Sequence, residues 1–260
     1  MTAWGAAVVG ESWFWLVAAG SAVAGIVRGL TGFGSNLVLF PILSMFAGPL
    51  TAAPVVTAID YASSALLLPA AFRRCRWSEV ARVSFGSAAF VTVGVAALVL
   101  LDGDLLLLFA ALFILAVVGP LWRQWRYRGR PHWAIAYAVG AISGFTGGAT
   151  TLAGPPIALF WLGGDADAAT FRANVIAFFG LTEGLAILVY AAKGLYSGPA
   201  LALCVMLVGF FAAGQWLGAK VFPHTSEERF RKIAFVLIIL VAIASLAKAG
   251  IDLLGRSGLV

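Results

Sequence analysis

The stretch GLTGFGSNLVLFPIL at residues 29–43 has a near copy, GFTGGATTLAGPPIA, at residues 144–158. Both stretches place glycine, threonine and proline inside strongly apolar surroundings. Glycine permits backbone conformations that end a helix, and proline lacks the amide hydrogen that a helix needs. The two stretches therefore predict two breaks in an otherwise helical chain.

The composition predicts that the chain folds in a lipid bilayer. Of its 260 residues 62% are hydrophobic and only 11% are charged, whereas a soluble domain keeps about a quarter of its residues charged. Apolar runs of membrane-spanning length recur along the chain, and they do not alternate as the strands of a membrane barrel do. We therefore expect an all-α integral membrane protein rather than a large soluble helical protein.

Apolar segments joined by short linkers are expected along the whole chain. They cover residues 13–30, 35–47, 51–71, 80–101, 105–121, 133–146, 149–162, 169–192, 199–219 and 232–254. Each of the longer ones is of the length that spans a bilayer, about 20 residues.

The net charge of +6 does not indicate a nucleic-acid partner, because the basic residues gather in three connections between apolar segments. They are Arg73, Arg74, Arg76 and Arg82; Arg123, Arg126, Arg128 and Arg130; and Lys220, Arg229, Arg231 and Lys232. Such connections lie in the cytoplasm under the positive-inside rule and can touch anionic lipid. The sequence therefore predicts a multi-pass protein whose N-terminus lies outside the cytoplasm, with membrane lipid as a partner.

The two copies align with an offset of 115 positions. Gly25, Gly29, Thr31, Gly32, Leu37, Pro41 and Ile42 match Gly140, Gly144, Thr146, Gly147, Leu152, Pro156 and Ile157. Counting crossings from the basic connections, the first copy begins outside and the second inside, and three long spans follow each. We predict an inverted repeat of two halves, residues 1–125 and 126–260, each a broken helical hairpin plus three transmembrane helices in one membrane domain. Secondary transporters use this plan and place the substrate at the repeat interface.

The arms of each broken hairpin can be arranged in two ways. They can be half-helices that meet near the bilayer midplane, or full crossings with the break at the membrane edge. The segments 35–47, 133–146 and 149–162 are short for full crossings, which favours the midplane.

The breaks predict a binding site for a small anion. A helix start has unpaired N–H groups and about half a positive charge, and second arms starting near Ser35 and Thr150 would aim these donors inward. The candidate substrate-binding residues are Arg28, Thr31, Gly32, Gly34, Ser35, Asn36, Thr146, Gly147, Gly148, Thr150 and Thr151. The alternative for the glycines is close helix packing, for which the spacings Gly25-x3-Gly29 and Gly140-x3-Gly144 are equally suited.

Arg28, Asp60 and Glu183 are ionisable residues within or beside apolar runs. A charge at the bilayer centre costs about 2.5–3.5 kcal/mol on insertion scales, so such residues are functional candidates. Arg28, whose counterpart in the second copy is Ser143, either binds the anion or forms an ion pair with Asp60 that only holds helices together. Asp60 or Glu183 would carry a coupling proton if burial favours the neutral acid; alternatively, a protonated Glu183 donates a hydrogen bond to a neighbouring helix.

The motifs GIVRGLTGFGSNLVLFPIL and GAISGFTGGATTLAGPPIALFWL, the second followed by FRANVIAFF, resemble the duplicated motif of the TauE/SafE (sulfite exporter) family of membrane anion permeases. The resemblance spans nearly the whole chain. It implies transport of sulfur-containing anions, chiefly sulfite and sulfonates, across the bacterial inner membrane, with a periplasmic N-terminus here. The matching positions are Gly29, Gly32, Pro41, Gly144, Gly147, Pro155 and Pro156, whereas Thr31, Phe33, Ser35 and Asn36 stand where the family often has glycine or small apolar residues.

These observations together predict a secondary transporter that moves a small anion, most simply a sulfur oxyanion or organosulfonate, by alternating access. Proton or cation coupling is expected, and no cofactor or metal. The alternatives are a passive anion channel and a carrier of a non-sulfur organic anion. An enzyme is disfavoured because the sequence has no Ser/His/Asp or His/Glu cluster. The direction of transport, the coupling ion and the oligomeric state are left open.

Overall fold

The computed structural model describes residues 11–65, 67–122, 133–162 and 167–221, and within these ranges the chain forms helices and no strand. The helices are α2 (Ser12–Thr31), α3 (Ser35–Ala47), α4 (Pro49–Ala65), α5 (Leu68–Arg74), α6 (Trp77–Leu100), α7 (Gly103–Trp122), α8 (Trp133–Thr150), α9 (Gly154–Leu162), α10 (Ala168–Ala192) and α11 (Gly198–Val221). The all-α prediction is confirmed for this part of the chain.

Several of these helices are suited to cross a membrane. Four helices of the described ranges are long and apolar enough, namely α2, α6, α10 and α11, and a fifth span results if α4 and α5 count as one bent helix. Large apolar side chains point away from the protein, including Phe85, Leu188 and Val205, which are 70%, 67% and 76% exposed. Outward apolar side chains on apolar helices fit a lipid surrounding.

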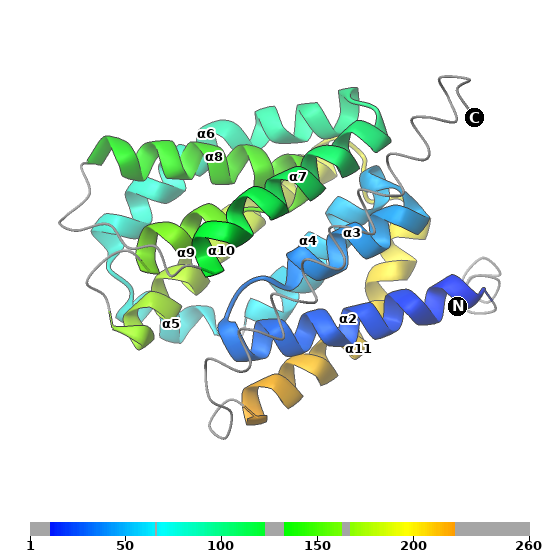
Figure 1. Ribbon diagram of the computed structural model, residues 1–260, viewed down its shortest axis with the longest axis horizontal. Coiled ribbons are helices and arrows are strands. Elements are labelled where there is room, and N and C mark those ends of the chain that lie inside the picture. Colours follow the sequence, from blue (N-terminus) through cyan, green and yellow to red (C-terminus); the bar gives the residue numbers. More distant parts are fainter. Residues whose placement is uncertain (1–10, 66, 123–132, 163–166, 222–260) are drawn as a thin grey trace.

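The long helices lie side by side (Figure 1), with α6 and α8 along one side of the molecule and α2 and α11 along the opposite side. The helices α3, α4 and α10 lie between these two pairs, and α10 packs against both α4 and α6. This middle layer is where the candidate site forms.

The pairs α2 with α11 and α8 with α6 pack backbone against backbone through glycines. A Cβ atom added to Gly25 would lie 2.1 Å from the carbonyl oxygen of Phe211, and one added to Gly140 would lie 2.1 Å from that of Val83. No real side chain tolerates such distances, so these positions require glycine. The packing role of these glycines is confirmed.

The two helix pairs also share one register. A Cβ atom on Gly214 would lie 2.0 Å from the Ala22 carbonyl, and one on Gly86 would lie 2.3 Å from the Tyr137 carbonyl. The residues of α2 and α8 differ by 115 positions in both contacts, and those of α11 and α6 differ by 128. Within each pair the two helices run parallel, because residue numbers rise together from one contact to the next. The two pairs run in opposite directions, since α2 and α8 point opposite ways in Figure 1.

The first break, between α2 and α3, lies where the sequence predicted it. Gly32 and Gly34 have φ angles of 80° and 87°, in the left-handed region that glycine adopts without strain. The next helix, α3, begins at Ser35 as expected.

The second break lies about one turn later than predicted. The helix α8 continues to Thr150, and α9 begins only at Gly154, so the prediction that the second arm starts near Thr150 was wrong. The turn is made at Thr151, whose φ is 60°. The reason is packing: a Cβ atom on Gly148 would lie 2.3 Å from the Val91 carbonyl, so this glycine serves a close helix contact instead of a turn.

The apolar run predicted at 51–71 also differs from the expectation. It forms two helices, α4 and α5, whose axes are inclined by 70°. Pro69 in the first turn of α5 lacks the amide hydrogen needed to continue α4. The connections predicted at 123–130 and around 229–232, the segment 232–254, the boundary at 125/126 and residues 1–10 lie outside the described residues.

Candidate functional site

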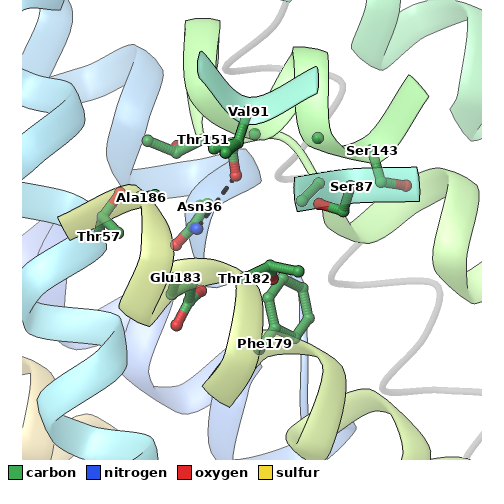
Figure 2. A pocket seen from close by; sticks show the side chains of 13 residues that line it. Asn36, Thr57, Ser87, Val91, Ser143, Thr151, Phe179, Thr182, Glu183 and Ala186 are labelled. Atoms are coloured by element: carbon green, nitrogen blue, oxygen red, sulfur yellow. Dashed lines mark hydrogen bonds between the residues drawn. The ribbon is translucent and has the colours of Figure 1, made fainter. Parts of the chain in front are cut away.

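The two helix breaks meet inside the protein. The side-chain amide of Asn36, in the first turn of α3, donates a hydrogen bond of 3.1 Å to the carbonyl oxygen of Thr151 (Figure 2). These residues are 115 positions apart, which is the offset between the two sequence motifs. Corresponding positions of the two copies are therefore in contact.

A small cavity lined by buried side chains lies beside this contact (Figure 2). The cavity has a volume of about 20 Å³, which is enough for one or two water molecules. The residues that give it polar groups are Asn36, Thr57, Ser87, Ser143, Thr151, Thr182 and Glu183. They come from α3, α4, α6, α8, α10 and the second break, so the cavity exists only where these elements converge.

Two residues of the lining have hydroxyl groups without a hydrogen-bond partner among the described residues. They are Ser143 and Thr151, which are 0% and 4% exposed. A buried hydroxyl without a partner is costly, so these groups favour a polar occupant of the cavity.

Arg28 is committed to an ion pair next to the cavity. Its Nε lies 3.2 Å from Oδ1 of Asp60, and the two side chains are only 3% and 1% exposed. The guanidinium also donates to the hydroxyl of Ser64 and lies 5.0 Å from the ring centroid of Phe179. Ser35 donates to the same carboxylate oxygen at 3.1 Å. The ion pair, one of the two roles considered for Arg28, is thus observed.

Glu183 forms no ion pair with a cation among the described residues. Its carboxyl group lines the cavity, its side chain is 6% exposed, and neither oxygen accepts or donates a hydrogen bond within the described part of the chain. Its carboxyl group lies close to that of Asp60, with which it interacts through charge and at hydrogen-bonding range, and it also interacts with the charge of Arg28. A buried carboxylate without donors is unfavourable, which singles out Glu183 among the buried ionisable groups.

The other predicted site residues lie near the breaks but away from the cavity. The hydroxyls of Thr146 and Thr150 donate to the carbonyls of Ile142 and Thr146, both at 2.9 Å. The Thr146 hydroxyl also lies 3.0 Å from the Leu152 carbonyl in the second break, so both hydroxyl groups have partners. The aliphatic part of the Arg172 side chain covers Gly32. A Cβ atom added to Gly32 would lie 3.4 Å from Cγ of Arg172.

Of the remaining glycines, Gly147 lines the cavity. Gly34 forms the turn before α3, and Gly148 serves the contact with α6. The side chain of Thr31 lies outside the described set.

Sequence reasoning missed Thr57, Ser87, Ser143, Phe179 and Thr182 as lining residues. Thr57 lies one helical turn before Asp60, and Thr182 is adjacent to Glu183. A search for polar residues within a turn of each buried acid would have found both. Ser87 carried no comparable signal, because its place depends on the packing of α6 against α8.

The comparison with protein families supplies the remaining observation. The family model described as sulfite exporter TauE/SafE matches residues 17–245. The chain belongs to the TauE/SafE family. No curated protein and no solved structure matches the chain.

Family membership confirms the resemblance carried by the two motifs. The matched range of this TauE/SafE chain includes both breaks and every residue that lines the cavity. Together with the apolar helices, it makes the chain a multi-pass membrane protein of a transporter family rather than an enzyme family.

Proposed function

We propose that this TauE/SafE protein is a secondary transporter that carries a small anion, a sulfur oxyanion or an organosulfonate, across the inner membrane by alternating access. The observation that carries the proposal is the contact between Asn36 and Thr151 beside a small cavity lined by seven polar residues among others. Transporters built from inverted repeats bind substrate where broken helices of the two repeats meet.

Two observations favour an inverted duplication. The helix pairs α2 with α11 and α8 with α6 repeat one register with constant offsets. Asn36 and Thr151, which correspond in the two copies, touch each other, as residues on a pseudo-two-fold axis must. In this arrangement both breaks lie inside the bilayer, and the two halves share one binding site.

Hydroxyl and amide donors suit an oxyanion at this site. Ser143 and Thr151 offer hydroxyl groups that are free within the described residues. Hydrogen bonds to an ionised acceptor are about twice as strong as neutral ones. Arg28 acts in this proposal through its ion pair, which places positive charge next to the cavity without occupying it.

The size of the cavity indicates which step of the cycle the structure represents. An oxyanion of four or five heavy atoms exceeds a space that holds one or two water molecules. In this proposal the lining helices separate to admit it, and the structure represents a conformation before that movement. The tightly packed glycine interfaces make α2 with α11 and α8 with α6 suitable rigid units for such a movement.

The proposed orientation follows from the ends of α6. Arg73 and Arg74 are exposed just before it, whereas Asp102 is exposed just after it. Under the positive-inside rule the start of α6 lies in the cytoplasm, near anionic lipid, and the N-terminus lies in the periplasm.

Flux into proteoliposomes tests the function. With an imposed ion gradient, the purified protein should accumulate sulfite, sulfate, thiosulfate or a sulfonate against its own gradient. Ser143→Ala should weaken the apparent affinity about tenfold, since a hydrogen bond to a charged group contributes roughly 1.5–3 kcal/mol. Ser44→Ala is the matched control, because Ser44 is also buried and unpartnered among described residues but does not line the cavity.

Three results would overturn parts of this proposal. Flux that only ever runs downhill indicates a channel. Accumulation of carboxylates in preference to sulfur oxyanions replaces the substrate class. A protein that binds and moves no anion is not the proposed transporter.

A further inference from the structure

The two halves of the protein differ in charge at corresponding positions. In the first half, Arg28 reaches the carboxylate of Asp60 at 3.2 Å. The residue 115 positions after Arg28 is Ser143, and it shares the cavity wall with Glu183. The second half therefore has a carboxyl group but no guanidinium to meet it.

Asp60 and Glu183 lie on α4 and α10, two helices that pack against each other. A Cβ atom on Gly184 would lie 3.4 Å from the Tyr61 ring, so these two positions are in contact as Asn36 and Thr151 are. Ser143 and Glu183 line one cavity, whereas Arg28 and Asp60 form an ion pair.

Short side chains line the cavity beside Glu183, whereas the guanidinium of Arg28 lies against Asp60. The cavity is bounded by Ser143 on α8, Ser87 on α6 and Glu183 on α10 (Figure 2).

The buried charges around Glu183 do not balance. The charged groups that interact with it are Asp60 on α4 and Arg28 on α2, and the hydroxyl of Tyr190 on its own helix also interacts with it. The lining residues that α6 and α8 contribute are Ser87, Val91, Ser143 and glycines, none of which titrates. Arg172, which interacts with Arg28, lies three turns before Glu183 on α10 and is not among the charged groups that act on Glu183. Of the groups that do, Arg28 leaves one negative charge uncompensated when both acids are ionised. An incoming anion would add another.

We propose that Glu183, and not Asp60, is the proton-coupling residue, and that it binds one proton whenever the cavity binds an anion. The carboxylate takes up the proton and becomes a carboxylic acid, whose O–H then donates to the anion. A proton needs no volume, whereas a metal cation would compete with the anion for the small cavity. This inference rests on the proposed anion transport.

Linkage sets the expected pH dependence. Since the anion and the proton favour each other's binding equally, the affinity for the anion should fall about tenfold per pH unit once Glu183 is ionised in the free protein. Glu183→Gln is neutral at every pH and still offers hydrogen-bond donors. This variant should bind the anion with an affinity independent of pH, and should exchange anions without using a proton gradient.

Calorimetry of the full chain in lipid nanodiscs tests the linkage. The probes are sulfate and methanesulfonate, because both keep their charge between about pH 5 and pH 8, and each titration is run in two buffers of different ionisation enthalpy. The wild-type protein should take up about one proton per anion, and Glu183→Gln none. Glu79→Gln is the matched control, because Glu79 is an acid on α6 paired with Arg76 and Trp161 away from the cavity. It should behave as wild type.

The outcomes separate this inference from the transport proposal. Anion binding without proton uptake, or a pH dependence that survives in Glu183→Gln, overturns the inference and leaves anion transport standing. If neither probe binds, anion transport itself fails for these substrates. Infrared difference spectra between anion-bound and anion-free protein give a second readout: a protonated-carboxyl band that appears with the anion in the wild type but not in Glu183→Gln supports the inference, and no such band overturns it.

Discussion

The side-chain amide of Asn36 lies 3.1 Å from the carbonyl oxygen of Thr151, and this hydrogen bond joins two helix breaks that are 115 residues apart. Both residues are buried, and both line the cavity. The contact therefore holds the two broken hairpins together and forms one wall of the candidate site.

Asn36→Ala should lower the free energy of unfolding by about 1–3 kcal/mol, because the Thr151 carbonyl would lose its buried donor. Chemical unfolding of the purified protein in detergent measures this change. Ser44→Ala on the same helix removes a buried hydroxyl that has no partner among the described residues, and should change stability by less than about 0.5 kcal/mol. Equal losses in both variants would show that the bridge contributes nothing of its own.

The glycine interface predicts opposite effects for two substitutions on α11. Gly214→Ala should destabilise the protein by about 3 kcal/mol through overpacking, because the new Cβ atom would lie 2.0 Å from the Ala22 carbonyl. Gly209 has nothing within 4 Å of an added Cβ atom, so Gly209→Ala should be neutral or stabilise the helix by up to about 1 kcal/mol. Thermal unfolding of both variants makes the comparison, and a tolerated Gly214→Ala would contradict the packing.

The pair of Arg28 and Asp60 should behave as a structural unit. Arg28→Met alone leaves a buried carboxylate without its cation and should cost about 3–5 kcal/mol. Adding Asp60→Leu should restore most of the lost stability, since an apolar pair of similar volume can replace a buried ion pair. A double-mutant cycle from unfolding curves gives the coupling. A stable Arg28→Met variant with weakened anion binding would instead assign Arg28 to the substrate.

Cys75 tests the orientation of the basic connection between α5 and α6. Its thiol is half-buried, and burial raises its pKa, so the reactive thiolate is scarce at neutral pH. In a Cys204→Ala background Cys75 is the sole cysteine. A membrane-impermeant maleimide should label it in inside-out vesicles, faster as the pH rises, and should not label it from the periplasmic side. Labelling from the periplasm would reverse the proposed topology.

Local features of the sequence predicted much of the fold. Apolar length predicted the helices now seen as α2, α3, α6, α7, α10 and α11 to within a few residues. Glycines at 32 and 34 predicted the first break, because a left-handed backbone is a property of the residue itself. The motif pair also predicted the family, which the match over residues 17–245 confirms.

Tertiary contacts decided the second break and the cavity. Gly148 looks like a turn residue in the sequence, but its contact with the Val91 carbonyl keeps it in α8, so Thr151 makes the turn. Likewise Arg28 and Glu183 were equivalent as buried ionisable residues until packing paired one and left the other facing a cavity.

The sequence by itself determined that this is a helical membrane protein with a duplicated, twice-broken plan, because hydropathy and glycine act over one or two helical turns. Only the tertiary structure decided which polar groups share the buried space. Hydrogen-bond and ion-pair partners are far apart in the sequence. Arg28 and Asp60 are more than thirty positions apart, and Asn36 and Thr151 are more than a hundred positions apart. Which of them meet depends on the register of closely packed helices, and local sequence does not encode that register.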